Sequence, residues 1–220
     1  MIAWAAVDPA TGALDHENGD VVVPAASTIK LFVYSAFRRS RLDPDDVAPA
    51  PRTRGTGVAE YLRTPLALAD HAFLMLAVSD NASTNVLLDR LGYDAVADEL
   101  TRLELEHTRV RRKMMSSGEE NLTTPLDLAR GLARLLDEPC ADELLTALRV
   151  AADAESFLPH LLGPDVSVAA KSGKTESVRH EVAYLEHGHR ALVTAVCSSP
   201  PARPDELAEP AAARWNAVRL

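Results

Sequence analysis

Aromatic residues and cysteines are scarce in this chain. Only 5% of its 220 residues are Phe, Trp or Tyr, which argues against the stacked aromatic platform that binds single-stranded nucleic acids. Cys140 and Cys197 are too few for a disulfide framework, and neither has a partner at CxxC spacing. His187 and His189 flank a glycine without a third ligand, which favours a hairpin turn over a zinc site. We therefore expect two buried or half-buried thiols, no metal and no cofactor.

Long apolar runs are also missing. No stretch approaches the roughly 20 apolar residues that a helix needs to span a bilayer. Residues 1–15, "MIAWAAVDPATGALD", lack the basic segment that begins an export signal and read as a strand followed by a turn. The sequence therefore predicts a protein that is either cytoplasmic or exported by a signal outside the 220 residues.

Positive charge is in the minority. The chain has 23 Lys and Arg against 32 Asp and Glu, a net charge of −9. This balance argues against a nucleic-acid or anionic-membrane partner, although one basic stretch, "RVRRK" (109–113), lies within it. Since 47% of the residues are hydrophobic, a real core is available. We expect a soluble globular monomer.

The apolar periodicity changes twice along the chain. Residues 1–25 contain two short segments typical of strands, "IAWAAVD" and "GDVVVPA", separated by turn residues. Over residues 27–154 the apolar spacing is mostly helical, from "STIKLFVYSAFRRS" to "ADELLTALRVAADA". Strands then return in "DVSVAAKSG", "VRHEVAYLEHG" and "HRALVTAVCSS". A final helix is expected over residues 203–220, despite Pro210.

A helical block framed by strands predicts an α+β fold. The simplest arrangement is one antiparallel sheet built from both chain termini, with a helical lobe inserted between them. We expect a single domain over residues 1–220. Its α/β lobe would comprise residues 1–26 and 155–220, and its helical lobe residues 27–154. A cleft between the lobes is the default place for a site.

A serine and a lysine lie three positions apart in the apolar segment "PAASTIKLFV". At this spacing Ser27 and Lys30 share one face of a helix, and a buried lysine is costly unless it has a partner or a purpose. Pro24 and the apolar run that follows favour a helix beginning near Ser27, at the positive end of its dipole. An S-x-x-K match occurs by chance about once in a chain of this length, so the pair alone also fits a capping serine and a solvated lysine.

Two further short motifs follow. "SDN" (79–81) comes directly after the apolar helix "HAFLMLAV", and in an extended tripeptide Ser79 and Asn81 would face one cleft. "KSG" (171–173) lies at a strand end, where its glycine permits close approach of another backbone. Each motif alone also fits a structural role, the first as a capped turn between helices and the second as an edge-strand lysine.

S-x-x-K, S-D-N and K-[TS]-G in this order form the motif set of class A β-lactamases and penicillin-binding proteins. Their joint occurrence by chance is far below about one in a hundred chains, and each falls in the expected element. The chain therefore resembles the class A β-lactamase superfamily of serine hydrolases. The resemblance runs almost end to end, from "VVVPAASTIKL" through "LMLAVSDNASTNVLLDRLG" to "KSGKTESVRHEVAYLEHG".

The resemblance implies a catalytic role for four residues. Ser27 would be the acyl-forming nucleophile and Lys30 its activating base, because serine is a weak nucleophile and a desolvated lysine near a second cation is neutral near pH 7. Ser79 would relay the proton toward a leaving nitrogen. Lys171 would attract the substrate carboxylate and tune Ser79. Asn81 would hold the amide side chain of a small-molecule substrate, a β-lactam or a related amide or ester.

The resemblance also implies a binding edge. The backbone N–H groups of Ser27 and Lys174 would form the oxyanion hole, beside Ser172 and Gly173 on the same strand. Arg179, on the next strand, fits a carboxylate-binding role and fits a salt-bridged surface position about equally well.

The sequence departs from the family pattern in the loop before "TTP". Met114 stands where class A β-lactamases carry the glutamate that activates the deacylating water, and methionine cannot take a proton from water. Glu119 and Glu120 are nearby but fit solvated carboxylates before the next helix. The chain also lacks the usual first helix, and Lys174 follows "KSG" where a small or hydroxylated residue is usual.

Three functions stay open at this point. The first is a serine hydrolase that forms an acyl-enzyme with β-lactams and deacylates slowly. The second keeps the same acylation but acts as a D-Ala-D-Ala peptidase or small-ester hydrolase. The third is a penicillin-binding protein that stays acylated.

Overall fold

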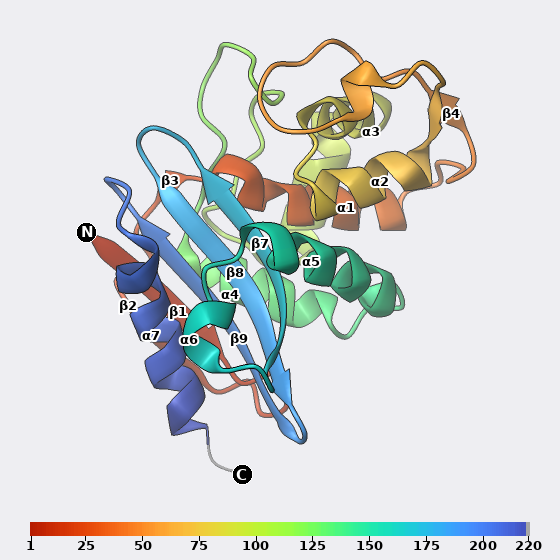
Figure 1. Ribbon diagram of the computed structural model, residues 1–220. Coiled ribbons are helices and arrows are strands. Elements are labelled where there is room, and N and C mark those ends of the chain that lie inside the picture. The colour runs from red at the N-terminus through yellow and green to blue at the C-terminus, as the bar shows by residue number, and fades with distance from the viewer. Residues whose placement is uncertain (219–220) are drawn as a thin grey trace.

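The computed structural model describes residues 1–218 of the chain, apart from the side chains of Glu155 and His160 (Figure 1). A five-stranded antiparallel sheet has the strand order β2-β1-β9-β8-β7. Its strands are β1 (Ile2–Val7), β2 (Leu14–Glu17), β7 (Ser167–Lys174), β8 (Arg179–His187) and β9 (Arg190–Ser198). Strands from both ends of the chain thus form one sheet, which confirms the predicted α+β architecture.

The second predicted strand was placed wrongly. The partner of β1 is β2, whose four residues are all exposed and therefore carry no apolar alternation to find in the sequence. Of the segment "GDVVVPA", only β3 (Val23–Pro24) is a strand, and it pairs with β6 (Leu122–Thr123) outside the main sheet. A second small ladder joins β4 (Val47–Ala48) to β5 (Leu66–Ala67).

Helices occupy the middle of the chain as predicted. A 3₁₀ turn, η1 (Ala26–Ile29), leads into α1 (Lys30–Arg39), and a second one is η2 (Ala59–Tyr61). The other helices are α2 (Leu68–Ala77), α3 (Asn81–Arg102), α4 (Pro125–Leu135), α5 (Ala141–Glu155), α6 (Pro159–Leu162) and α7 (Pro204–Ala217). Helix α3 is broken at Gly92, whose φ of 76° and ψ of 161° are not helical, so it consists of two helical segments. The C-terminal helix contains Pro210 as expected, and residues 219–220 of that prediction lie outside the described residues.

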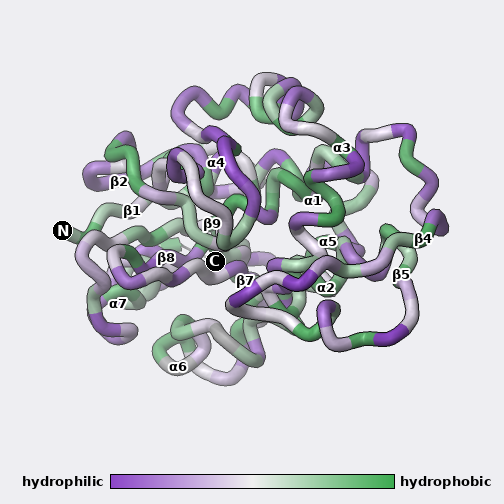
Figure 2. Tube along the Cα trace, turned by 90° about the horizontal axis from the view of Figure 1, so that it is seen from above, coloured by the Kyte–Doolittle hydropathy of each residue, from purple (hydrophilic) through white to green (hydrophobic). Residues whose placement is uncertain are grey.

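Alternate residues of the strands face two apolar clusters. On β1, Ala5 and Val7 belong to the larger cluster with the helices α1 to α5, whereas Trp4 and Ala6 belong to the smaller one with α7. Figure 2 shows α1 as a mainly hydrophobic segment inside the molecule, while hydrophilic residues gather in outer loops. The sheet is therefore covered on both faces.

Helices α4 and α5 belong to the predicted helical lobe, yet both contact the sheet. The lobe boundaries at residues 26/27 and 154/155 therefore stay a prediction. Cys140 and Cys197 are buried free thiols, as predicted. Within residues 1–218, the helices are all too short or too polar to cross a membrane.

Candidate active site

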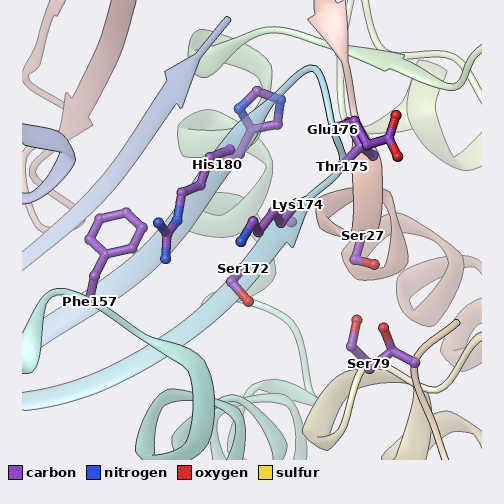
Figure 3. A pocket seen from close by; sticks show the side chains of 11 residues that line it. Ser27, Ser79, Phe157, Ser172, Lys174, Thr175, Glu176 and His180 are labelled. Carbon is purple, nitrogen blue, oxygen red and sulfur yellow. The ribbon is translucent and has the colours of Figure 1, made fainter. Parts of the chain in front are cut away.

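A cavity of about 590 Å³ opens where β7 and β8 meet η1 and the turn before α3 (Figure 3). Its lining includes the predicted site residues Ser27, Ser79, Ser172, Gly173, Lys174 and Arg179. The remaining predicted site residues, Lys30, Asn81 and Lys171, are buried. The motifs are far apart in the sequence, and the fold brings their side chains to the cavity and to the interior beside it.

Ser27 lies in the 3₁₀ turn η1, one turn earlier than the α-helix itself begins. The residue before it, Ala26, has a φ of 49°, a left-handed conformation that is costly for a residue with a Cβ atom. Two hydrogen bonds hold this turn: the Thr28 hydroxyl donates to Ala25 O at 2.6 Å, and the Ala25 N–H donates to Asn121 O at 2.7 Å. Ser27 is thus presented on a rigid turn at the cavity.

Gly173 lets the edge of the sheet approach this turn. A Cβ atom on Gly173 would lie 3.0 Å from the Ser27 nitrogen and 3.1 Å from the Thr28 nitrogen. Both contacts are with backbone atoms, which cannot rotate away. The predicted close approach at the "KSG" glycine is therefore present, and it brings the β7 backbone beside the Ser27 N–H group.

Lys30 is fully buried and is held by the SDN motif. Its ammonium nitrogen donates to Ser79 O at 2.6 Å, to Ser79 Oγ at 3.1 Å and to Asn81 Oδ1 at 2.8 Å. The reason for this convergence differs from the one predicted. Residues 79–81 are not extended, because Ser79 has a φ of 54° and Asp80 is the N-cap of α3.

Asp80 fixes the loop on the other side of the motif. Its Oδ2 accepts from the N–H groups of Val58 at 2.5 Å and Ala59 at 2.8 Å, while Oδ1 accepts from Ser83 N at 2.8 Å. The Asn81 N–H donates to the backbone oxygen of Thr56, which lines the cavity. The middle residue of SDN is therefore structural, and it ties a distant loop to the site.

Lys171 is fully buried on β7, where its ammonium donates to Ser172 O at 3.1 Å. The neighbouring strand contributes two buried titratable residues that the sequence did not single out. His180 lines the cavity and shares a hydrogen bond of 2.8 Å between Nε2 and Pro24 O, and burial lowers its pKa. Burial raises the pKa of Glu181 to about 7, although a hydrogen bond from Ser156 and the charge of Lys171 oppose this shift.

The backbone of Met114 is hydrogen-bonded to the side chain of Asn85 in α3. Its N–H donates to Asn85 Oδ1 at 2.8 Å, and Asn85 Nδ2 donates to Met114 O at 3.1 Å. The two nearby carboxylates form ion pairs with arginines of the same loop: Glu119 pairs with Arg111, and Glu120 pairs with Arg112. Among the described residues that line the cavity, Glu176 is the one carboxylate.

The cavity is cationic although the chain is acidic. Lys174 and Arg179 line it together with one carboxylate, Glu176, and a third cation, Lys171, is buried in the same strand edge, in a chain of net charge −9. Such a local excess of positive charge attracts an anionic ligand. No cluster of potential metal ligands occurs among the described side chains.

The fold and this site together have the architecture of β-lactamases and transpeptidases. A model of the beta-lactamase enzyme family matches residues 2–215, so the chain belongs to that family. It is a β-lactamase-like hydrolase. No curated protein matched the chain.

Solved structures agree with this assignment. A β-lactamase from Sphaerobacter thermophilus is 25% identical with a TM-score of 0.85, over 98% of this chain and 89% of that chain. PBP-A is 24% identical with a TM-score of 0.88, over 99% of this chain and 89% of that one. A β-lactamase from Burkholderia ambifaria is 22% identical with a TM-score of 0.86, over 99% and 94%. The last two similarities concern the fold alone.

Some residues of the site lie outside the three sequence motifs. Thr56, Phe157 and His180 line the cavity but belong to no motif. Thr56 and Phe157 lie in loops. His180 lies opposite Gly173 because β7 and β8 pair in this register. For His180, the sequence offered one signal: in the strand predicted around it, residues 180 and 182 share a face, and Val182 is apolar.

Proposed function

We propose that this chain is a serine hydrolase that forms an acyl-enzyme with β-lactams through Ser27. The buried amino group of Lys30 carries the proposal. It lies three residues after Ser27 and binds both Ser79 and Asn81, where a solvated surface lysine would bind neither.

In the acylation step, neutral Lys30 takes the proton of the Ser27 hydroxyl while Ser27 Oγ attacks the lactam carbonyl. The C–N bond of the ring then breaks. The lactam nitrogen receives the proton of the Ser79 hydroxyl. Ser79 Oγ lies 3.1 Å from the Lys30 nitrogen, and it accepts in turn the proton that Lys30 took from Ser27. The N–H groups of Ser27 and Lys174 stabilise the oxyanion, a role that the close approach of Gly173 to the Ser27 nitrogen supports.

Substrate binding uses the cationic edge of the cavity. The substrate carboxylate meets Ser172 and Arg179 at the cavity lining, where it is attracted by the charge of buried Lys171, and Asn81 holds the amide side chain on the other side. The positive charge of this edge within an acidic chain supports the choice of an anionic substrate.

Deacylation is slow in this proposal. The thioether of Met114 cannot activate water, and the Asn85 side chain fixes the Met114 backbone where the family's glutamate is expected. Loss of general-base help slows such a step about 10²–10⁴-fold. The acyl-enzyme therefore accumulates, and turnover continues at a low rate.

The experiment mixes the protein with a chromogenic cephalosporin and, separately, with a p-nitrophenyl ester, and follows colour and intact mass together. We expect one covalent adduct per chain with the cephalosporin, and none with Ser27→Ala. An undiminished adduct in Ser27→Ala, or no adduct and no turnover in the unmodified chain, would contradict the proposal.

The missing carboxylate at Met114 favours a second candidate, a D-Ala-D-Ala peptidase or ester hydrolase with the same acylation step. A further candidate is a penicillin-binding protein without turnover. One solved structure similar to this chain, at 24% identity, is a variant of PBP-A described as an acyl-enzyme complex with penicillin G. Release of D-alanine from a D-Ala-D-Ala peptide, faster than cephalosporin turnover, identifies the peptidase. A permanent adduct without any product identifies the trapping protein.

A further inference from the structure

Phe157 forms the wall of the cavity on the side away from Ser27 (Figure 3). It lies in the segment between α5 and α6, over the face of β8 that carries Arg179 and Glu181. These two residues are two positions apart on one strand, so both side chains point toward that segment. Phe157 contacts both of them, one through its ring and the other through its backbone.

Glu181 fixes the backbone of the segment. Its Oε1 accepts from the Ser156 hydroxyl at 2.5 Å, and its Oε2 accepts from the Phe157 N–H at 3.3 Å. The Ser156 hydroxyl oxygen in turn accepts from Leu158 N at 3.2 Å. Glu181 is 1% exposed and pairs in register with Ser172, which lines the cavity. Phe157 is thus attached to the strand pair that forms the binding edge.

The Phe157 ring lies beneath the Arg179 guanidinium, whose central carbon is 5.8 Å from the ring centroid. No carboxylate is paired with Arg179 among the described residues, while Glu181, the acid on the same strand face, is engaged by Ser156 and Phe157. An arginine side chain has many rotamers, and an aromatic face selects the few in which its charge lies over the ring. Arg179 is therefore held at the cavity with its charge available.

We propose that Phe157 is a positioning residue for substrate recognition, because its ring holds Arg179 where the guanidinium meets the substrate carboxylate and Glu181 anchors the ring. This inference rests on the proposed acylation of Ser27, and it adds a specificity determinant that belongs to none of the sequence motifs.

The first experiment tests the stacking without any substrate. The Nε–H resonance of Arg179, assigned by NMR with the variant Arg179→Lys, is expected to show an upfield ring-current shift in the unmodified chain. Phe157→Leu should remove this shift, whereas Phe157→Tyr, which keeps an aromatic face, should retain it. An Arg179 resonance that does not respond to Phe157→Leu overturns the proposal.

The second experiment compares acylation by penicillin G with acylation by its methyl ester, which lacks the negative charge. A cation–π contact of this kind is worth about a 3- to 10-fold change in rate. We expect the ratio of the two acylation rates to fall by that factor in Phe157→Leu and in Arg179→Lys, and to recover in Phe157→Tyr. In an Arg179→Ala background, Phe157→Leu should leave the ratio of the two rates unchanged. If Phe157→Leu lowers the ratio there as much as it does in the unmodified chain, the proposal is overturned.

The matched control is Arg190→Met. The central carbon of the Arg190 guanidinium lies 4.4 Å from the centroid of the Trp215 ring, outside the cavity lining, so this uncharged variant removes the same kind of contact and should leave the ratio unchanged. If the unmodified chain forms no adduct with either penicillin, the proposed function fails, and the NMR experiment alone decides whether Phe157 positions Arg179. Equal losses with penicillin G and its ester in Phe157→Leu would show a structural role only.

Discussion

At the scale of single residues, the site depends on how a buried cation is held. The Lys30 nitrogen is hydrogen-bonded to Ser79 O, Ser79 Oγ and Asn81 Oδ1, and the side chain is fully buried. Burying an amino group is costly unless its hydrogen bonds are satisfied, and here they are satisfied by Ser79 and Asn81, which the proposed acylation and substrate binding also use. In this proposal, function and stability share the same contacts at Lys30.

Replacing Lys30 with methionine should separate the two roles. Lys30→Met keeps a chain of similar length but has no amine, so we expect acylation by penicillin to slow about 10²–10⁴-fold, since general-base help is lost. Intact-mass measurements over time give the rate. Lys113→Ala, which removes a partly exposed lysine paired with Asp89, serves as the control. Acylation of Lys30→Met at the unmodified rate would remove Lys30 from the mechanism.

In the proposed mechanism, Met114 leaves the deacylation step without the glutamate that would activate water. Penicillin should give a burst of one equivalent followed by a slow steady state, because the acyl-enzyme forms faster than water removes it. Quenched-flow product measurements and intact mass report both phases. Met114→Glu should speed the slow phase if its carboxylate reaches the water. A steady state as fast as the first turnover, with no visible adduct, would show that another group activates the water, and Glu119 and Glu120 would be examined first.

At the scale of elements, the site is a contact between a strand edge and a helix start. Gly173 on β7 faces the backbone nitrogens of Ser27 and Thr28 in η1, and His180 on β8 binds Pro24 O just before that turn. Two neighbouring strands therefore hold the same turn from one side. The position of Ser27, the proposed nucleophile, therefore depends on the register of β7 and β8 as much as on the helix.

Gly173→Ala tests this contact. The new methyl group would lie 3.0 Å from the Ser27 nitrogen, so β7 and η1 must separate by a few tenths of an ångström. We expect acylation to fall about 10²-fold or more, the usual loss when one oxyanion donor is misplaced. The melting temperature, measured in parallel, shows whether the fold survives. Unchanged acylation would mean that the two elements move apart without consequence for the oxyanion hole.

The sequence predicted these elements unevenly. Strands β1, β7, β8 and β9 and the long helices have clear apolar periods, and the motifs located Ser27, Lys30 and Lys171 because their spacing is local. β2 was missed because all of its side chains are exposed, and β3 and β6 are too short to have a period. The extended geometry predicted for residues 79–81 was wrong, because Ser79 is left-handed, whereas the alternative of a capped turn between helices is confirmed by Asp80, the N-cap of α3.

At the scale of the whole molecule, two buried titratable side chains next to the cavity affect stability in opposite directions with pH. Burial lowers the pKa of His180, so the unfolded chain binds more protons there and stability rises as the pH rises through that range. Burial raises the pKa of Glu181 from 4.5 to about 7, so the native chain binds more protons and stability falls between these values. A pH–stability curve of the unmodified chain therefore contains partly cancelling contributions.

The variant Glu181→Gln isolates the contribution of Glu181 to the pH dependence of stability. Glutamine keeps both contacts, because its carbonyl accepts from the Phe157 N–H while its amide donates to the Ser156 hydroxyl, but it does not titrate. The penalty of ionised Glu181 is absent below pH 4.5, grows up to about pH 7 and is then complete, at roughly 3 kcal/mol. We therefore expect Glu181→Gln to gain stability over the unmodified chain from pH 5 to pH 8, by several degrees in melting temperature. The difference between the two curves removes the His180 contribution, which both chains share. Parallel curves from pH 5 to pH 8 would mean that Glu181 ionises in the folded protein as easily as in the unfolded chain, and that its burial is relieved by the positive charge of Lys171 and the two hydrogen bonds.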